Sequence, residues 1–110
     1  MSNSSIAISL VVPVYNEEAN IRPFLERVER VFESMGKSYE IIFSLDPSPD
    51  RTEEVIIEEI NRNPNIKLII FSRRFGQPAA TMAGILSCHG ESCVVIDVDL
   101  QDQPELIKER

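Results

Sequence analysis

Residues 94–102 read Val94-Val95-Ile96-Asp97-Val98-Asp99-Leu100-Gln101-Asp102, an apolar run that ends abruptly in carboxylates. Such a run of β-branched residues predicts a buried strand that emerges from a sheet into a polar site. Side chains alternate along a strand, so Asp97 and Asp99 point to the same face and repel each other unless a cation or a raised pKa relieves them. Hard oxygen ligands suit Mg²⁺ or Mn²⁺, and Gln101 adds a neutral oxygen. The stretch therefore predicts a metal–nucleotide site, although acidic residues at strand ends are also often merely solvated.

Length and composition fit one small globular domain of 110 residues with an apolar fraction of 43%. The net charge of −7 argues against binding to nucleic acid or to an anionic membrane. An anionic substrate would therefore need a divalent cation to dock. Cys88 and Cys93 lack metal-site spacing, and neither a signal segment nor a bilayer-length apolar run is present, so we expect a cytoplasmic protein with free thiols.

Four apolar runs alternate with three helical patterns along the chain. The runs predict strands over residues 6–14, 39–45, 67–71 and 93–98, and the patterns predict helices over 21–35, 52–61 and 77–88. Strictly alternating strands and helices predict a Rossmann-like, three-layer α/β fold with a parallel sheet of order 3-2-1-4. Ligands bind such sheets at the carboxyl ends of the strands, here between the first and the fourth.

Local signals refine these elements. Pro13 has no N–H, so regular pairing of the first strand should end near it. Asn20 is a candidate N-cap and Gly36 a stop signal for the first helix. For the third helix we expect an inward face made of Ala79, Met82, Ala83 and Leu86. His89, the only histidine, is expected to be a surface residue of the following turn rather than a general base.

Polar clusters follow the predicted strands at one edge of the sheet. The residues delivered there are Pro13-Val14-Tyr15-Asn16-Glu17, Asp46, Arg73 and Asp97-Val98-Asp99. No P-loop signature and no Gly-x-Gly-x-x-Gly motif after the first strand is present, which argues against two common nucleotide sites. The position of the Asp-x-Asp pair on the fourth strand also disfavours an Asp-nucleophile phosphatase and a receiver domain.

Four ordered blocks resemble family 2 glycosyltransferases. They are Val12-Pro13-Val14-Tyr15-Asn16-Glu17-Glu18, Asp46-x-Ser48-x-Asp50-x-Thr52, Ser72-Arg73-x-Phe75-Gly76 and Asp97-Val98-Asp99-Leu100-Gln101-Asp102-x-Pro104-Glu105. The chain is most similar to the polyprenyl-phosphate branch, which includes dolichol-phosphate mannose synthase and the bactoprenol glucosyltransferases. The resemblance implies the nucleotide-binding half of a GT-A fold.

The resemblance also implies roles for individual residues. Pro13, Val14, Tyr15 and Glu17 would line the nucleoside pocket, Asp46 would bind the base, and Arg73 would approach the donor phosphates. Asp97 would contact the nucleoside or the metal, and Asp99 and Gln101 would hold Mg²⁺ or Mn²⁺ on the diphosphate. Departures from the family pattern near Asp46, at Leu45, Pro47 and Arg51, leave the identity of the base open.

The implied enzyme moves a sugar from a donor of the UDP-glucose or GDP-mannose type to a lipid phosphate, with inversion. Residues 1–110 are then expected to be a single domain, the N-terminal donor-binding part of a longer, membrane-associated protein. The catalytic base would lie beyond residue 110, and we expect self-association of the fragment through an unfinished sheet edge. A nucleotidyltransferase-like module and a non-catalytic binding or assembly domain remain the alternatives.

Overall fold

The computed structural model describes residues 6–73, 76–96 and 98 of the chain. Its elements follow the predicted alternation of strands and helices. They are β1 (Ile8–Val14), α1 (Ile21–Met35), β2 (Tyr39–Leu45), α2 (Thr52–Arg62), β3 (Ile66–Ile70), α3 (Gln77–Leu86) and β4 (Ser92–Val95). All strand pairings are parallel and the order is β3-β2-β1-β4, which confirms the predicted sheet.

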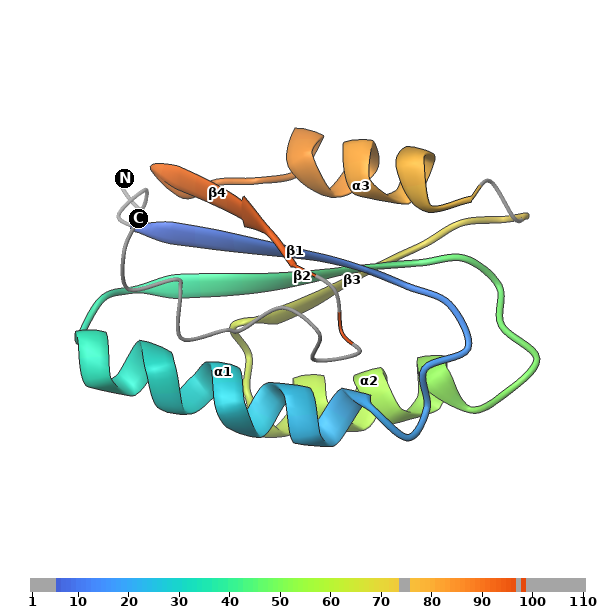
Figure 1. Ribbon diagram of the computed structural model, residues 1–110, viewed down its shortest axis with the longest axis horizontal. Helices are drawn as coiled ribbons and strands as arrows, with labels where there is room; N and C mark the ends of the chain where they lie inside the picture. Colours follow the sequence, from blue (N-terminus) through green and yellow to red (C-terminus); the bar gives the residue numbers. More distant parts are fainter. Residues whose placement is uncertain (1–5, 74–75, 97, 99–110) are drawn as a thin grey trace.

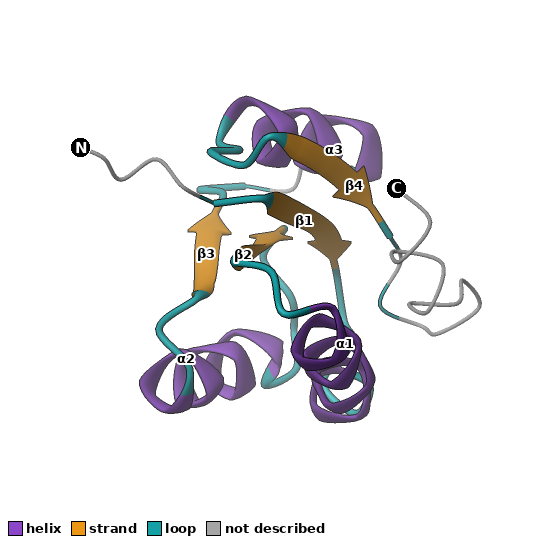
Figure 2. Ribbon diagram, turned by 90° about the vertical axis from the view of Figure 1, so that its left-hand side faces the viewer, coloured by secondary structure: helices purple, strands orange, loops and turns teal. Residues whose placement is uncertain are grey.

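Three layers make up the fold. Helices α1 and α2 cover one face of the sheet and α3 covers the other (Figures 1 and 2). Most of the buried core lies between β1, β2 and α1, and it includes Leu10, Val12, Phe24 and Phe32. All seven residues of β1 are buried, as expected for a central strand covered on both faces.

The pairing of β1 ends near Pro13, as predicted, but one residue after it. The register with β2 continues through Pro13–Ser44 to Val14–Leu45. In a parallel strand, alternate residues bond to opposite neighbours. Val11 accepts the N–H of Ile96 on the β4 side, whereas Val14 accepts the N–H of Asp46 on the β2 side. The missing N–H of Pro13 therefore faces the β4 side, where the pairing of the two strands has already stopped, and no bond to β2 is lost.

Helix α1 has the predicted bounds and the predicted apolar face. Gly36 ends it in the left-handed conformation, with φ 67°, and donates its N–H to the carbonyl of Phe32. Asn20 occupies the N-cap position, but its side chain caps no helix N–H. The side-chain amide of Asn20 instead donates to Glu17 Oε1 at 2.8 Å, which attaches the preceding loop to the helix.

The inward face of α3 differs from the prediction. Met82 is 55% exposed and Leu86 is 80% exposed, whereas Ala80 and Gly84 are buried. A Cβ atom on Gly84 would lie 2.3 Å from Val11 Cγ1, so the helix contacts the sheet through its smallest residues. Close approach of backbone to sheet, rather than burial of large side chains, sets the orientation of this helix.

The strands β3 and β4 differ slightly from their predicted bounds. Strand β3 begins and ends one residue before the predicted segment, and β4 ends at Val95 rather than at residue 98. Within the described residues β4 pairs only with β1, and self-association through its other edge stays a prediction. None of the helices in the described part of the chain has the length and apolar character needed to cross a bilayer.

Candidate functional site

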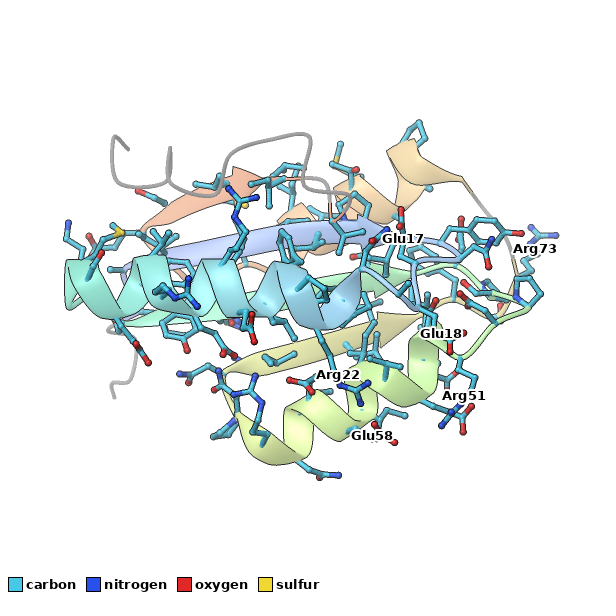
Figure 3. The ribbon with its side chains drawn as sticks, turned by 60° about the horizontal axis from the view of Figure 1, so that its bottom comes forward. Glu17, Glu18, Arg22, Arg51, Glu58 and Arg73 are labelled. Atoms are coloured by element: carbon cyan, nitrogen blue, oxygen red, sulfur yellow. The ribbon has the colours of Figure 1, made fainter. Side chains whose placement is uncertain are left out.

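The loops after β1, β2 and β3 leave the sheet at one edge. Val14 pairs with Leu45 and Leu45 with Ile70, so the three strands end in line. Glu17, Glu18, Arg51 and Arg73 gather at this end of the molecule (Figure 3). The structure thus brings together the predicted residues that it describes, and the edge is where ligands bind in open parallel sheets.

The first strand contributes buried and accessible residues to this edge. Pro13 and Val14 are buried, so their side chains belong to the core of the fold. Tyr15 and Glu17 are partly exposed in the β1–α1 loop, residues 15–20. Asn16 lies between them with φ 58°, a left-handed conformation that asparagine tolerates better than most residues.

Asp46 joins two of the loops. It is 3% exposed, and its Oδ2 accepts the N–H of Gly76 at 2.9 Å. Gly76 has φ 94° and precedes the first residue of α3, so the end of β2 is tied to the start of that helix. The carboxylate of Asp46 is therefore held in a fixed place between the loop that carries Arg73 and the end of β1.

Three side chains of the β2–α2 loop and the start of α2 bind successive backbone amides of the β1–α1 loop. The N–H groups of Asn16, Glu17 and Glu18 donate to Ser48 Oγ (2.9 Å), Thr52 Oγ1 (2.9 Å) and Asp50 Oδ2 (3.1 Å), respectively. We call Ser48, Asp50 and Thr52 the loop clamp. These residues belong to the block Asp46-x-Ser48-x-Asp50-x-Thr52, but the sequence does not predict what their side chains bind.

Asp50 organises the loop clamp. Its Oδ1 accepts both the hydroxyl of Thr52 at 2.6 Å and the N–H of Thr52 at 3.1 Å. The hydroxyl proton of Thr52 thus points at Asp50, which leaves a lone pair for Glu17. Burial raises the pKa of Asp50, but the Thr52 hydroxyl and the N–H groups of Glu18 and Thr52 outweigh that effect and hold the pKa below its usual value. Asp50 is therefore an anionic acceptor at neutral pH.

A hollow of about 630 Å³ lies between the β1–α1 loop and α2. Its two arginines are engaged by carboxylates of α2: Arg22 pairs with Glu58 and Glu59, and Arg51 pairs with Glu54 (Figure 3). The acidic lining residues are Glu17, Glu18, Asp50 and Glu58. Four carboxylates against two paired guanidinium groups make this hollow a poor place for a diphosphate.

The predicted metal ligands Asp97, Asp99 and Gln101 lie outside the described residues. In residues 6–73, 76–96 and 98, no three His, Cys, Asp or Glu side chains come together as a metal site. Strand β4 runs parallel to β1 and leads the chain toward the same edge, and Ile96 and Val98 are buried there. A set of two carboxylates and one amide suits a hard divalent ion chemically.

His89 lies at the opposite, amino end of the sheet. Its side chain is largely exposed in the turn after α3, as predicted, and its Nδ1 is 3.3 Å from Glu40 Oε1. Its backbone N–H donates to Glu40 Oε2 at 2.7 Å. The contact between His89 and Glu40 therefore holds the fold at the amino end of the sheet.

The sequence pattern described as glycosyl transferase family 2 matches residues 9–109. The chain belongs to this family. It is 45% identical over 104 residues to the glycosyltransferase YkcC of Bacillus subtilis, covering 94% of the chain and 32% of that relative. It is 38% identical over 101 residues to an undecaprenyl-phosphate 4-deoxy-4-formamido-L-arabinose transferase of Edwardsiella ictaluri, covering 91% of the chain and 31% of the relative.

Two solved structures share the fold. The mannosyltransferase PcManGT of Pyrobaculum calidifontis, in complex with GDP-Man and Mn²⁺, superposes with a TM-score of 0.75 at 22% identity over 88% of the chain and 29% of its own. TarS of S. aureus in complex with UDP-GlcNAc gives a TM-score of 0.70 at 26% identity over 94% of the chain and 32% of its own. The chain spans about a third of the length of these proteins, and the predicted family and fold are both confirmed.

Proposed function

We propose that this chain is the donor-binding part of a metal-dependent, inverting glycosyltransferase that uses a nucleoside-diphosphate sugar. The observation that carries the proposal is the convergence of the loops after β1, β2 and β3 at the carboxyl edge of the sheet in a family 2 fold. A relative that acts on undecaprenyl phosphate and neighbours in complex with GDP-Man or UDP-GlcNAc support it. A polyprenyl phosphate is the proposed acceptor.

The nucleoside would lie against the backbone of Pro13 and Val14 and the side chains of Tyr15 and Glu17. Asp46 would accept a hydrogen bond from the base, since its carboxylate is already fixed beside this pocket by Gly76. Arg73, which is exposed in the β3–α3 loop, would approach the donor phosphates.

The proposed metal ligands are Asp97, Asp99 and Gln101, with Mg²⁺ or Mn²⁺ as the ion. When bound, the ion would act as a Lewis acid that neutralises charge on the diphosphate leaving group. An oxygen of the acceptor phosphate would bond to the anomeric carbon from the face opposite the leaving group, and the bond to the nucleoside diphosphate would break. The configuration at that carbon is inverted as a result.

Residues 1–110 would form one domain within the longer protein. Because the chain spans about a third of its relatives, we place the acceptor-binding region and the catalytic base in sequence that follows these residues. Donor binding, rather than turnover, is therefore the property to measure on this chain.

The test is calorimetric titration of the chain with UDP and GDP, each with and without Mn²⁺. We expect one nucleotide to bind more tightly with Mn²⁺, by about tenfold or more, because the ion offsets the repulsion between the diphosphate and a chain of net charge −7. Asp99→Ala should abolish that metal dependence.

The matched control is Asp102→Ala, which removes a carboxylate of the same stretch that has no proposed ligand role. This variant should keep the Mn²⁺ effect. If the folded parent chain bound neither nucleotide, the donor-binding proposal would be wrong and the non-catalytic assembly domain would be favoured. If Asp102→Ala abolished the metal effect as fully as Asp99→Ala, the assignment of the ligands would be wrong.

A further inference from the structure

The loop clamp engages three successive backbone donors of the β1–α1 loop. The N–H groups of Asn16, Glu17 and Glu18 all donate to clamp side chains, and that of Asn20 donates to the carbonyl of Glu17 at 2.9 Å. Glycine-rich phosphate loops work in the opposite way, because their free N–H groups point at the anion. The β1–α1 loop therefore presents carbonyl groups and side chains, rather than these amides, to a ligand.

The charge of the loop leads to the same conclusion. Glu17 and Glu18 lie on the loop, and the anionic Asp50 lies directly behind it. Acceptor groups and negative charge suit the N–H and hydroxyl donors of a base and a ribose, and they repel phosphate. The nucleoside, and not the diphosphate, is thus the part of a donor that this loop fits.

The loop clamp also explains how the loop keeps its shape. Asn16 has a left-handed backbone, which is unfavourable for a non-glycine residue unless neighbouring contacts hold it. Its N–H is held by Ser48, and the next N–H is held by Thr52, which is fully buried. Water cannot readily replace a buried hydroxyl as acceptor, so loss of the Thr52 oxygen would leave the N–H of Glu17 unsatisfied.

We propose that Ser48, Asp50 and Thr52 are positioning residues for the nucleoside part of the donor. They touch the protein backbone and shape the loop that carries Tyr15 and Glu17. This inference rests on the proposed donor-binding function. It concerns the nucleoside part of the donor, which the proposed function already places at the β1–α1 loop.

The test compares Thr52→Val with Thr52→Ser. Valine keeps the shape of threonine but removes the oxygen, whereas serine keeps the oxygen. For whichever of UDP and GDP the parent prefers, we expect Thr52→Val to weaken binding of the nucleoside diphosphate about tenfold and binding of the nucleoside alone by the same factor. The factor by which Mn²⁺ tightens diphosphate binding should stay unchanged, and Thr52→Ser should restore the parent affinity within about twofold.

Two further variants separate positioning from general stability. Ser48→Ala removes one hydroxyl from a half-buried loop position. It should weaken binding of the nucleoside and of the nucleoside diphosphate by one common factor, which is smaller than the factor for Thr52→Val. This variant tests the proposal even if Thr52→Val folds poorly. Ser44→Ala is the control, because Ser44 is buried but its hydroxyl has no hydrogen-bond partner among residues 6–73, 76–96 and 98. It should leave both affinities unchanged.

The outcomes are distinguishable. If the parent binds and the clamp variants, folded at the temperature of measurement, bind as tightly as the parent, the positioning role is wrong and the donor-binding function stands. If the clamp variants weaken binding of the nucleoside diphosphate but not of the nucleoside, the assignment of these residues to the nucleoside part of the donor is wrong. If the parent itself binds neither UDP nor GDP, both proposals fail. Binding is best followed by NMR titration, since the nucleoside alone will bind weakly.

Discussion

The two ends of the sheet use the same chemistry for different purposes. At each end a carboxylate collects N–H and hydroxyl donors from neighbouring segments: Asp50 at the carboxyl end and Glu40 at the amino end. Glu40 is closed off, with a side chain 1% exposed, whereas Asp50 stands in a loop beside an open hollow. Glu40 lies away from the ligand edge and serves to hold the fold, while Asp50, beside the open edge, also shapes a place for a ligand.

The amino end is the more tightly built of the two. Glu40 accepts from Ser9 Oγ at 2.5 Å and from Lys67 Nζ at 2.7 Å, in addition to the N–H of His89. Ser9 Oγ in turn accepts the N–H of Gly90 at 2.7 Å. These bonds join the first strand, the second strand and the turn after α3, so the amino end fixes α3 against the sheet.

The largest expected effect is the loss of the Glu40 charge. Glu40→Gln places an amide donor among groups that already donate, so it should lower the free energy of unfolding by about 3 kcal/mol at pH 7. Chemical denaturation measures this. The matched control is Glu54→Gln, which breaks an exposed pair with Arg51 and should cost under about 0.5 kcal/mol. If both variants lowered the free energy of unfolding equally, the amino end would not be the more tightly built of the two.

The pH dependence of stability tests the same carboxylate without a mutation. Burial raises the pKa of Glu40, but the hydrogen bonds from Lys67, Ser9 and His89 outweigh it and lower the pKa from its ordinary 4.5 to about 2. A lowered pKa stabilises the fold above pH 4.5, and this contribution is lost as the pH falls toward 2. The difference in unfolding free energy between the parent and Glu40→Gln should therefore shrink across that window. A difference that stayed constant would mean that Glu40 is not the group responsible.

A smaller effect distinguishes the glycines of the two ends. A Cβ atom on Gly90 would lie 2.7 Å from the backbone nitrogen of Ser9, so Gly90→Ala must shift backbone and should cost about 2 kcal/mol. A Cβ atom on Gly76 meets nothing nearer than 3.9 Å, and Gly76→Ala is opposed only by its φ of 94°, at about 1 kcal/mol. Thermal and chemical unfolding of both variants give the order. The reverse order would show that the carboxyl end is the more constrained.

The sequence predicted those parts of the fold that follow from hydrophobic pattern. The order of the strands, the apolar face of α1 and the stop at Gly36 all appear as expected, because each depends on periodicity or on one local residue. The face of α3 was predicted wrongly because periodicity gives weight to Met82 and Leu86, while the helix contacts the sheet through Gly84. Close approach of a helix backbone to side chains of the sheet leaves no apolar pattern in a sequence.

The candidate site likewise has parts that the sequence predicts and parts that it does not. Which loops converge follows from parallel topology, so Tyr15, Asp46 and Arg73 could be assigned to one edge. The loop clamp could not be predicted, because its bonds join a side chain to a backbone N–H more than 30 residues away. A polar residue at every second position, as in Ser48-x-Asp50-x-Thr52, was the only signal, and it fits a capped helix equally well. Glu40 gave less warning still, since an acidic residue in a strand ordinarily indicates the solvent face.

The bond between Asp46 and Gly76 bears on any attempt to transplant this site into another scaffold. A designer who moved only the segment after β2 would carry Asp46 without the N–H that orients it, because that donor belongs to a segment 30 positions later. The smallest portable unit therefore includes the glycine before α3 as well. Libraries that diversify the two segments independently would separate partners, and recombination that keeps them together should yield a larger share of folded variants.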